Sequence, residues 1–471
     1  MAVRTIGIGA QKHFIIYKSN ALKSLIRSSV VCPDYSKIYP MISHGEGIFL
    51  YDESGKEYID GSSGAAAVSN IGHGITEIAD IIREQTLKVS VLPTHVFSSR
   101  IVQDYLDNLV AFAPAGFARA WTVTSGTEAV ENAVKLAIQY HQIKGDHKRY
   151  KIISRNISYH GNSIFMLDIG GMPLRKRIYS NWMNHFPHIS AANLYRKPAE
   201  LDEAGYVSLL VSEFEQTLLD GDPGSFAAFV AEPVVAAAMG AVPAPSGYFE
   251  QIHLVCKKYG VLFISDEVLT GFGRTGARFG INRSAVIPDI IATGKGISGG
   301  YYPLSAVIAS KQVMEPFESL NSFFSGGHTY ACNPVGAAVG QFTIEYMERF
   351  RLIENAEIQG KYLKEKLHRL HNYDIVGDIR GEGLLLGVEF VKDKITKAPF
   401  PPDMNISKRI GELALHAGVV LYPGKGSCDG LTGDHILICP PLIINNDQCD
   451  LIVDVLESSI KKLMDEIARV N

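Results

Sequence analysis

The feature that most limits how this chain can fold is a repeated alternation of short apolar runs with longer amphipathic segments. The apolar runs cover residues 121–124, 151–154, 226–231, 261–265, 290–293 and 305–309. Such a rhythm predicts an α/β fold, in which crossover helices connect the strands of a mostly parallel sheet and cover both of its faces. Functional side chains are then expected where those strands end, at their carboxyl termini.

The chain has 471 residues, which is more than one hydrophobic core usually organises. Amphipathic helices are predicted at 355–370, 406–416 and 447–468, around a strand at 384–390. Near the start, the sequence of residues 47–61 predicts a hairpin that turns at Ser54 and Gly55. We therefore expect a large domain at 61–335, a smaller α+β domain at 336–471, and an N-terminal segment, 1–60, that contributes to the smaller one.

Composition excludes several classes of partner. The formal net charge is −4, and no stripe of clustered lysine and arginine is present, so neither nucleic acid nor an anionic membrane surface is an expected partner. No apolar run is long enough to cross a bilayer. The six cysteines are scattered, without the close pairing of metal sites, and favour a reduced compartment. We expect a cytoplasmic protein.

The first 33 residues contain no Asp or Glu, while Arg4, Lys12, Lys18, Lys23 and Arg27 are interleaved with apolar residues and serines. That composition is typical of an organelle transit peptide. The competing interpretation, which we favour, is a basic amphipathic helix that packs on the protein's own body. Organelle targeting is therefore the minor alternative for the location of the protein.

The segment TSGTEAVENAVKLA at 124–137 follows a predicted strand and opens a predicted helix. Helix N-termini bind anions, so the backbone N–H groups of Ser125, Gly126 and Thr127, with the two hydroxyls, could hold a phosphate there. Gly126 would let the backbone approach closely. The alternative is an ordinary helix cap without a ligand.

Asp266 stands at the end of an apolar strand in LFISDEVLTGFGRTG, residues 262–276. A buried carboxylate requires a partner, and the protonated nitrogen of a pyridine ring would serve. Two alternatives remain for Asp266, which could cap a turn or pair with Arg274.

Lys295 follows another apolar strand and has a glycine on each side. A partly desolvated lysine near a second cation has the lowered pKa that makes an amine nucleophilic enough to form a Schiff base. The alternatives are a surface lysine in a glycine turn and a P-loop. The P-loop fails because Asp289 and Gly296 stand where that motif requires Gly and Ser or Thr.

These three segments occur in a fixed order, with Lys295 standing 29 positions after Asp266. Their combination resembles the class III aminotransferases of the type I fold that depends on pyridoxal 5'-phosphate (PLP). The resemblance extends from residues 47–61 and NIGHG at 70–74 to CPPL at 439–442. It implies that Lys295 carries the cofactor and that Asp266 supports the ring nitrogen.

The resemblance also implies further contacts with the cofactor. Ser125 and Gly126 would hold its phosphate, Tyr159 of YHG would stack on its ring, Val268 would support the other face, and Glu232 would lie beside its oxygen. Thr127 and His160 are further expected contacts with the cofactor. Thr329 of GGHTYACNP would reach the phosphate of a partner subunit, which implies a homodimer. No metal is expected, since His185 and His188 have no third ligand in sight, and we expect both in a loop.

The activity that the resemblance implies is transfer of an amino group from an amine or amino acid to a 2-oxo acid such as pyruvate or 2-oxoglutarate. Lys295 would move the proton, in a ping-pong sequence. Decarboxylation, racemisation or movement of the amine within one molecule could use the same scaffold. A non-enzymatic interaction or regulatory protein is a third hypothesis, although the reactive lysine argues against it.

The substrate is less constrained. Many relatives that act on α-amino acids carry an arginine before a segment like CPPL, where this chain has Leu437, and those that prefer amines carry one where it has Tyr422. Lys425 and Arg380 could bind an acid, although Arg380 could equally be structural and Lys425 could simply be solvated. Small residues at 65–67 predict a roomy pocket, hence a larger amine or an amino acid with its nitrogen away from the carboxylate, of the omega- or beta-amino type.

Overall fold

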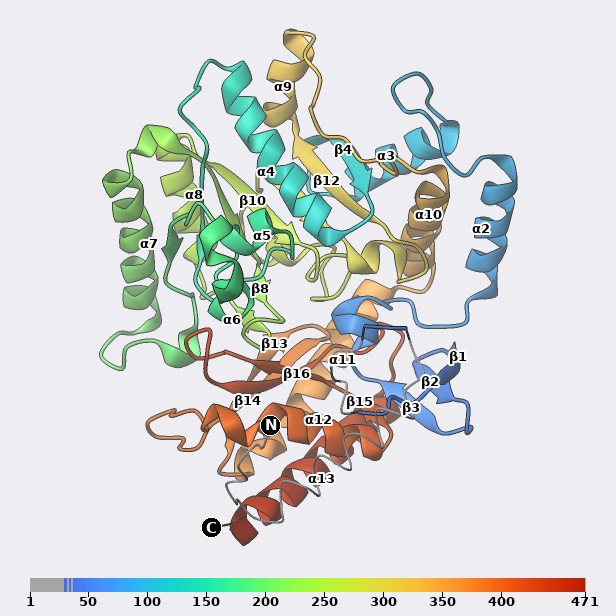
Figure 1. Ribbon diagram of the computed structural model, residues 1–471, viewed down its shortest axis with the longest axis vertical. Helices are drawn as coiled ribbons and strands as arrows, with labels where there is room; N and C mark the ends of the chain where they lie inside the picture. The colour runs from blue at the N-terminus through green and yellow to red at the C-terminus, as the bar shows by residue number, and fades with distance from the viewer. Residues whose placement is uncertain (1–28, 32–33, 35–36, 471) are drawn as a thin grey trace, which may run out of the picture.

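The computed structural model describes residues 29–31, 34 and 37–470, and its framework is a seven-stranded sheet in the order β4-β12-β11-β10-β7-β5-β6 (Figure 1). Neighbouring strands are parallel, except that β12 is antiparallel to both β11 and β4. The mostly parallel sheet that the apolar runs predict is therefore confirmed. Its strands are β4 (Phe117–Val123), β5 (Lys151–Arg155), β6 (His188–Ile189), β7 (Phe226–Ala231), β10 (Leu262–Glu267), β11 (Ile290–Thr293) and β12 (Ser305–Ser310).

Helices cover both faces of this sheet, which explains why its strands are almost continuously apolar. In β10, Phe263 faces one hydrophobic core and Ile264 faces the other, and both are fully buried. One core lies under α4 (Gly126–Ile143), and the other is shared with α3 (Arg100–Phe112), α7 (Glu203–Asp220), α8 (Tyr248–Tyr259) and α10 (Pro334–Arg349). The remaining helices of this part are α2 (Thr76–Lys88), α5 (Ile164–Ile169), α6 (Pro173–Lys176) and α9 (Lys311–Ser319).

The C-terminal part contains a second sheet, antiparallel throughout, in the order β13-β14-β17-β16. Its strands are β13 (Val376–Glu382), β14 (Leu385–Phe390), β16 (Tyr422–Lys425) and β17 (Asp434–Ile438), and its helices are α11 (Leu352–Leu367), α12 (Ile406–His416) and α13 (Asn446–Val470). The predicted helix at 406–416 coincides with α12. The predicted helix at 355–370 begins three residues earlier, and its last residues form a 3₁₀ turn.

The predicted N-terminal hairpin is present as β2 (Phe49–Asp52) and β3 (Glu57–Asp60), which are antiparallel and follow β1 (Ile42–Glu46). Gly55 adopts φ +83° in the turn, a conformation that glycine tolerates. Strand β3 also pairs in parallel with β15 (Val419–Val420), so the N-terminal hairpin and the C-terminal part share one sheet (Figure 1). The exact domain boundaries stay a prediction.

Two further expectations have different outcomes. His188 is not in a loop but begins β6, and its Nε2 lies 3.1 Å from the carbonyl oxygens of Ile169 and Gly170, so that expectation is wrong. The basic segment 1–33 lies almost wholly outside the described residues. In the part of the chain that the structure describes, no helix combines the length and the apolarity needed to cross a bilayer.

Candidate active site

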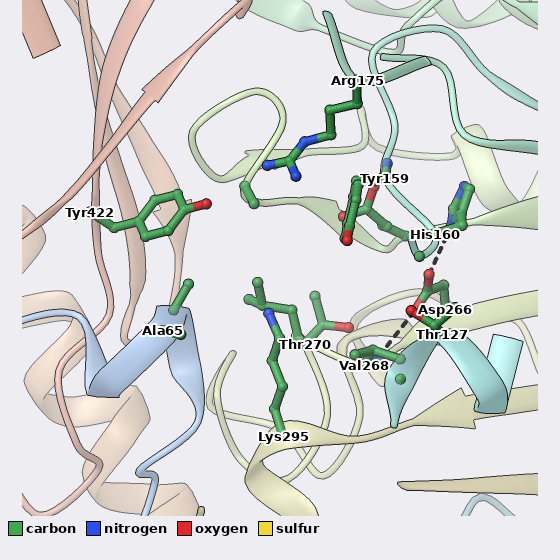
Figure 2. A pocket seen from close by; sticks show the side chains of 16 residues that line it. Ala65, Thr127, Tyr159, His160, Arg175, Asp266, Val268, Thr270, Lys295 and Tyr422 are labelled. Carbon is green, nitrogen blue, oxygen red and sulfur yellow. Dashed lines mark hydrogen bonds and ion pairs between the residues drawn. The ribbon is translucent and has the colours of Figure 1, made fainter. Parts of the chain in front are cut away.

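A cavity of about 290 Å³ lies where β10, β11 and the start of α4 converge. Gly126, Tyr159, Asp266, Val268 and Lys295, which are far apart in the sequence, all line it (Figure 2). Thr127, His160 and Glu232 line it too. Strand ends therefore bring together eight of the ten residues that the sequence singled out, as expected for the edge of a mostly parallel sheet.

Ser125 and Thr329 are the two residues outside the lining of this cavity, and both are exposed. Ser125 is the N-cap of α4, and its hydroxyl oxygen accepts a hydrogen bond from the N–H of Glu128 at 3.2 Å. Thr329 stands in the exposed loop before α10. Its predicted role toward a partner subunit stays a prediction.

The start of α4 carries a capping box as well as free donors. The carboxylate of Glu128 accepts the N–H of Ser125 at 3.3 Å, so this N–H is not free, contrary to the prediction. The first intrahelical bond begins with the N–H of Ala129, which donates to the carbonyl of Ser125. The N–H groups of Gly126 and Thr127 precede that bond and remain for an anion.

Gly126 is required by packing. A Cβ at this position would lie 2.6 Å from Cγ1 of Val268, closer than real Cβ contacts. The glycine therefore lets the first turn of α4 lie directly against the residue predicted to support one face of the cofactor ring. This contact was not foreseen, because the sequence does not reveal which side chain faces a glycine.

Asp266 is nearly fully buried, with 5% of its surface exposed, at the end of β10. Its Oδ2 lies 2.7 Å from Nδ1 of buried His160, and its Oδ1 accepts the N–H of Val268 at 3.1 Å (Figure 2). Arg274, the alternative ion partner, is bonded instead to Asn70, Ser63 and two backbone carbonyls. A carboxylate that is held by His160 and still lines the cavity can accept a hydrogen bond from a protonated ring nitrogen.

Lys295 begins the 3₁₀ turn Lys295–Ser298 directly after β11, and its side chain extends into the cavity (Figure 2). Its backbone adopts φ +48°, an unusual conformation for a residue other than glycine. Burial lowers the pKa of its amine, whereas Cys439, Asp266 and Glu232 act in the opposite direction, and the nearby cation Arg274 contributes least. Desolvation, more than a neighbouring cation, prepares this amine for nucleophilic attack.

Tyr159 and Glu232 form one wall of the cavity. The N–H of Tyr159 donates to Oε1 of Glu232 at 3.0 Å, which ties the aromatic residue to the end of β7. Burial raises the pKa of Glu232 above its ordinary value and also raises that of the Tyr159 phenol. The ring of Tyr159 faces the cavity, opposite the side on which Val268 lies (Figure 2).

The two arginine positions of relatives lie directly opposite each other. Tyr422 on β16 pairs with Leu437 on β17, and only Tyr422 lines the cavity. Arg380 is buried, forms ion pairs with Asp378 and Glu389, and does not line the cavity. The ammonium of Lys425 donates to the carbonyl of Pro402 at 3.2 Å, also outside the cavity. Both therefore have structural roles, and the suggestion that they bind an acid is wrong.

Arg175 is the most informative lining residue that sequence reasoning missed. It lies in the short helix α6, and Lys176 and Arg177 follow it directly in the sequence. Its guanidinium carbon is 4.6 Å from the ring centroid of Tyr159. Three adjacent basic residues give no periodic signal that distinguishes one from another, so only the fold reveals which of them faces the cavity.

Comparison with known proteins agrees with this geometry. The family model of class III aminotransferases matches residues 30–460. This chain belongs to the class III aminotransferases. An uncharacterized aminotransferase of Schizosaccharomyces pombe is 39% identical over 425 residues, which cover 89% of this chain and 92% of the relative. A diaminobutyrate–2-oxoglutarate transaminase of Halomonas elongata is 32% identical, over 91% of this chain and 92% of the relative.

Solved structures of aminotransferases have the same fold. An omega-transaminase from Thermomicrobium roseum superposes with a TM-score of 0.86 at 32% identity, over 97% of this chain and all of that one. A transaminase obtained by ancestral reconstruction gives a TM-score of 0.88 at 30% identity. Aminotransferases of class III depend on PLP, so the predicted fold, enzyme class and cofactor are confirmed.

The residues that line the cavity fit PLP. Free N–H groups at the start of α4 suit its phosphate, a carboxylate at the end of β10 suits its ring nitrogen, and a desolvated lysine lines the same cavity. Nε2 of buried His160 has no hydrogen-bond partner among the described residues, so it is available to a bound group or a water molecule. The assignment of individual residues to these contacts is part of the proposal below.

Proposed function

We propose that this aminotransferase moves an amino group from an omega- or beta-amino donor to a 2-oxo acid such as pyruvate or 2-oxoglutarate, in a ping-pong sequence. The observation that carries this proposal is that Lys295, the pair formed by Asp266 and His160, and the start of α4 line a single cavity. One cavity must then receive the donor and the acceptor in turn, as a ping-pong sequence requires.

Each residue has a proposed role that follows from its surroundings. Bound PLP supplies a ring that withdraws electrons from the substrate carbon and so allows a bond at that carbon to break. Lys295 would hold the cofactor and, with its amine released, would move the proton from the substrate carbon as general base and acid. Asp266, oriented by His160, keeps a proton on the ring nitrogen, and the N–H groups of Gly126 and Thr127 fix the phosphate.

Family membership favours transfer over decarboxylation, racemisation or amine migration, because relatives that are similar over most of this chain are named as aminotransferases. The donor type is inferred from the cavity. Ala65 and Ala66 line it, and the two positions where relatives bear an arginine hold Tyr422 and Leu437. Small residues leave room for a larger donor, and we propose that its nitrogen lies away from any carboxylate.

A cytoplasmic, homodimeric enzyme remains part of the proposal. The cysteines that the structure describes are all free thiols, and burial raises the pKa of Cys256 well above its ordinary value, as it does for Cys439 and Cys449. Such thiols are unreactive and suit a reducing compartment. The exposed loop that carries Thr329 supports the proposed contact with a second subunit.

Two-substrate kinetics test this function. Initial rates are measured with β-alanine, 4-aminobutyrate and diamines as donors, at several fixed concentrations of pyruvate or 2-oxoglutarate. We expect double-reciprocal plots with parallel lines and stoichiometric appearance of alanine or glutamate. Intersecting lines would contradict the ping-pong sequence. Loss of carbon dioxide from the donor, or consumption of donor in excess of the enzyme when no 2-oxo acid is present, would contradict transfer itself.

A further inference from the structure

One charged side chain of the cavity has no role in the proposed function. Arg175 extends from α6, and Figure 2 shows its guanidinium directed into the space that Lys295 and Tyr422 also face. Its described contact is the face of Tyr159, and among the described residues it makes no ion pair and no side-chain hydrogen bond. A guanidinium has five N–H donors, so several remain for a ligand.

The other charged groups of the lining already have partners. Asp266 contacts His160 and the N–H of Val268, and Glu232 accepts the N–H of Tyr159. Lys295 is required for the cofactor under the proposed function. Of the cations among the described lining residues, Arg175 alone is left for an anionic group of a substrate.

Packing connects the two elements that carry Arg175 and Tyr422. Pro173 begins α6, and a Cβ on Gly430 would lie 2.4 Å from Cδ of Pro173, so α6 rests on the loop that follows β16. Strand β16 carries Tyr422, whose hydroxyl points into the same space as the guanidinium (Figure 2). The cation–π contact of Arg175 with the ring of Tyr159 further limits where its guanidinium can lie.

We propose that Arg175 is the carboxylate receptor of this active site, with the hydroxyl of Tyr422 as a second donor. An arginine fork binds a carboxylate with two parallel hydrogen bonds. The inference rests on the proposed function and names its substrate class: 2-oxo acids as acceptors, and donors that carry an acid group at a distance from the amine, in preference to plain amines. Since both substrates enter the same cavity in turn, one receptor serves both.

Binding of unreactive probes tests this inference independently of catalysis. Holoenzyme is titrated with matched acid and amide pairs, from propionate and propionamide to hexanoate and hexanamide, and the cofactor absorbance reports binding. The Arg175→Met variant should bind the acids roughly tenfold more weakly or worse, and the amides unchanged. The control is Arg177→Met, since Arg177 is exposed and outside the cavity. We expect this control to match the wild type.

The Tyr422→Phe variant should bind the acids about threefold more weakly relative to the matched amides, because it lacks one hydrogen bond to the carboxylate. Equal binding of acids by wild type and Arg175→Met would overturn the inference. An equal loss for acids and amides would overturn it too, because that pattern reports a general disturbance of the cavity. Cofactor absorbance identical to that of the wild type shows that the variants have folded.

Kinetics separate this inference from the proposed function. In the wild type, kcat/KM for 4-aminobutyrate should exceed that for butylamine, and Arg175→Met should reduce this ratio roughly tenfold and raise the KM for pyruvate. If the wild type transfers amino groups but the ratio is unchanged in Arg175→Met, the inference is wrong and the proposed function stands. If the wild type transfers none, the proposed function is wrong, and the probe titration still decides what Arg175 binds.

Discussion

Gly126 starts α4 against the side chain of Val268, and its missing Cβ is what allows that contact. The Gly126→Ala substitution should cost about 1–3 kcal/mol of unfolding free energy by overpacking, and should weaken binding of PLP because the phosphate donors move. Chemical denaturation and cofactor titration measure both effects. Gly224→Ala, where the nearest described atom is 3.5 Å away, is the matched control and should change neither.

A second substitution separates the causes. If the clash with Val268 is responsible, Val268→Ala in the Gly126→Ala background should restore part of the stability, since the two residues are coupled. An effect of Gly126→Ala that Val268→Ala leaves unchanged would show that flexibility of the backbone, not this contact, is what the glycine provides.

Lys295 gives a pH dependence with a definite sign. Burial lowers its pKa below the ordinary 10.5, so between the folded pKa and 10.5 the unfolded chain binds more protons than the folded apoenzyme. Unfolding free energy attributable to Lys295 therefore rises with pH through that window. Apoenzyme and apo Lys295→Met are denatured at several pH values, and the advantage of the methionine variant should shrink as pH rises. A constant advantage would contradict a buried, desolvated amine.

At the level of elements, glycines inside two helices should respond in opposite ways. A Cβ on Gly360 of α11 would lie 2.2 Å from the backbone of Gly383, in the turn between β13 and β14. A Cβ on Gly411 of α12 would meet Pro423 at an ordinary 3.4 Å. Helix propensity favours alanine at both sites by up to about 1 kcal/mol. Only at Gly360 should the close contact with the backbone of Gly383 outweigh this gain in stability, so that alanine destabilises the protein.

The measurement is the unfolding free energy of each alanine variant. Gly360→Ala should lose about 2 kcal/mol or more, because backbone on the other side cannot give way, and Gly411→Ala should be neutral or more stable. Stabilisation by Gly360→Ala would show that α11 does not lie as close to the β13–β14 turn as described.

The elements differ in how well the sequence predicts them, for physical reasons. Strands β7 and β11 are found at the predicted residues because each is a fully buried apolar run, and α12 because its amphipathic pattern begins and ends cleanly. Strand β6, two residues long, exists only through its pairing with β5, and no local pattern signals it. The one-turn helix α6 is too short to show an amphipathic pattern in the sequence, which is why Arg175 was not predicted to line the cavity.

Within the site, residues with a local sequence pattern were predictable, and contacts between distant segments were not. Lys295, Asp266 and Gly126 were identified because a strand end followed by a charged residue or a glycine is a local pattern. The contacts between distant segments were not predictable. They include His160 with Asp266, Val268 with Gly126, and the buried ion pair of Arg380 with Glu389. Each depends on the crossing of elements that are distant in the sequence.

At the scale of the whole molecule, the central prediction is that two subunits complete each other's sites through Thr329. Lys295→Ala and Thr329→Val are each expected to reduce activity. In mixed dimers, about half of the total, the subunit with intact Lys295 receives Thr329 from the other subunit, so one site is restored. Activity of the co-expressed mixture should exceed the average of the two variants measured alone, which is what independent sites would give. A monomer in sedimentation, or no recovery on mixing, would contradict the shared site.

The attachment of the cofactor to Lys295 is the claim on which the rest depends, and reduction followed by peptide mapping tests it most directly. Purified holoenzyme is treated with sodium borohydride, digested, and analysed by mass spectrometry, with Lys295→Ala in parallel. We predict that the reduced cofactor mass is found on the peptide that contains Lys295, that the visible absorbance band disappears on reduction, and that Lys295→Ala lacks both. Cofactor mass on a different lysine, or a wild-type enzyme that binds PLP without modification of Lys295, would contradict the account.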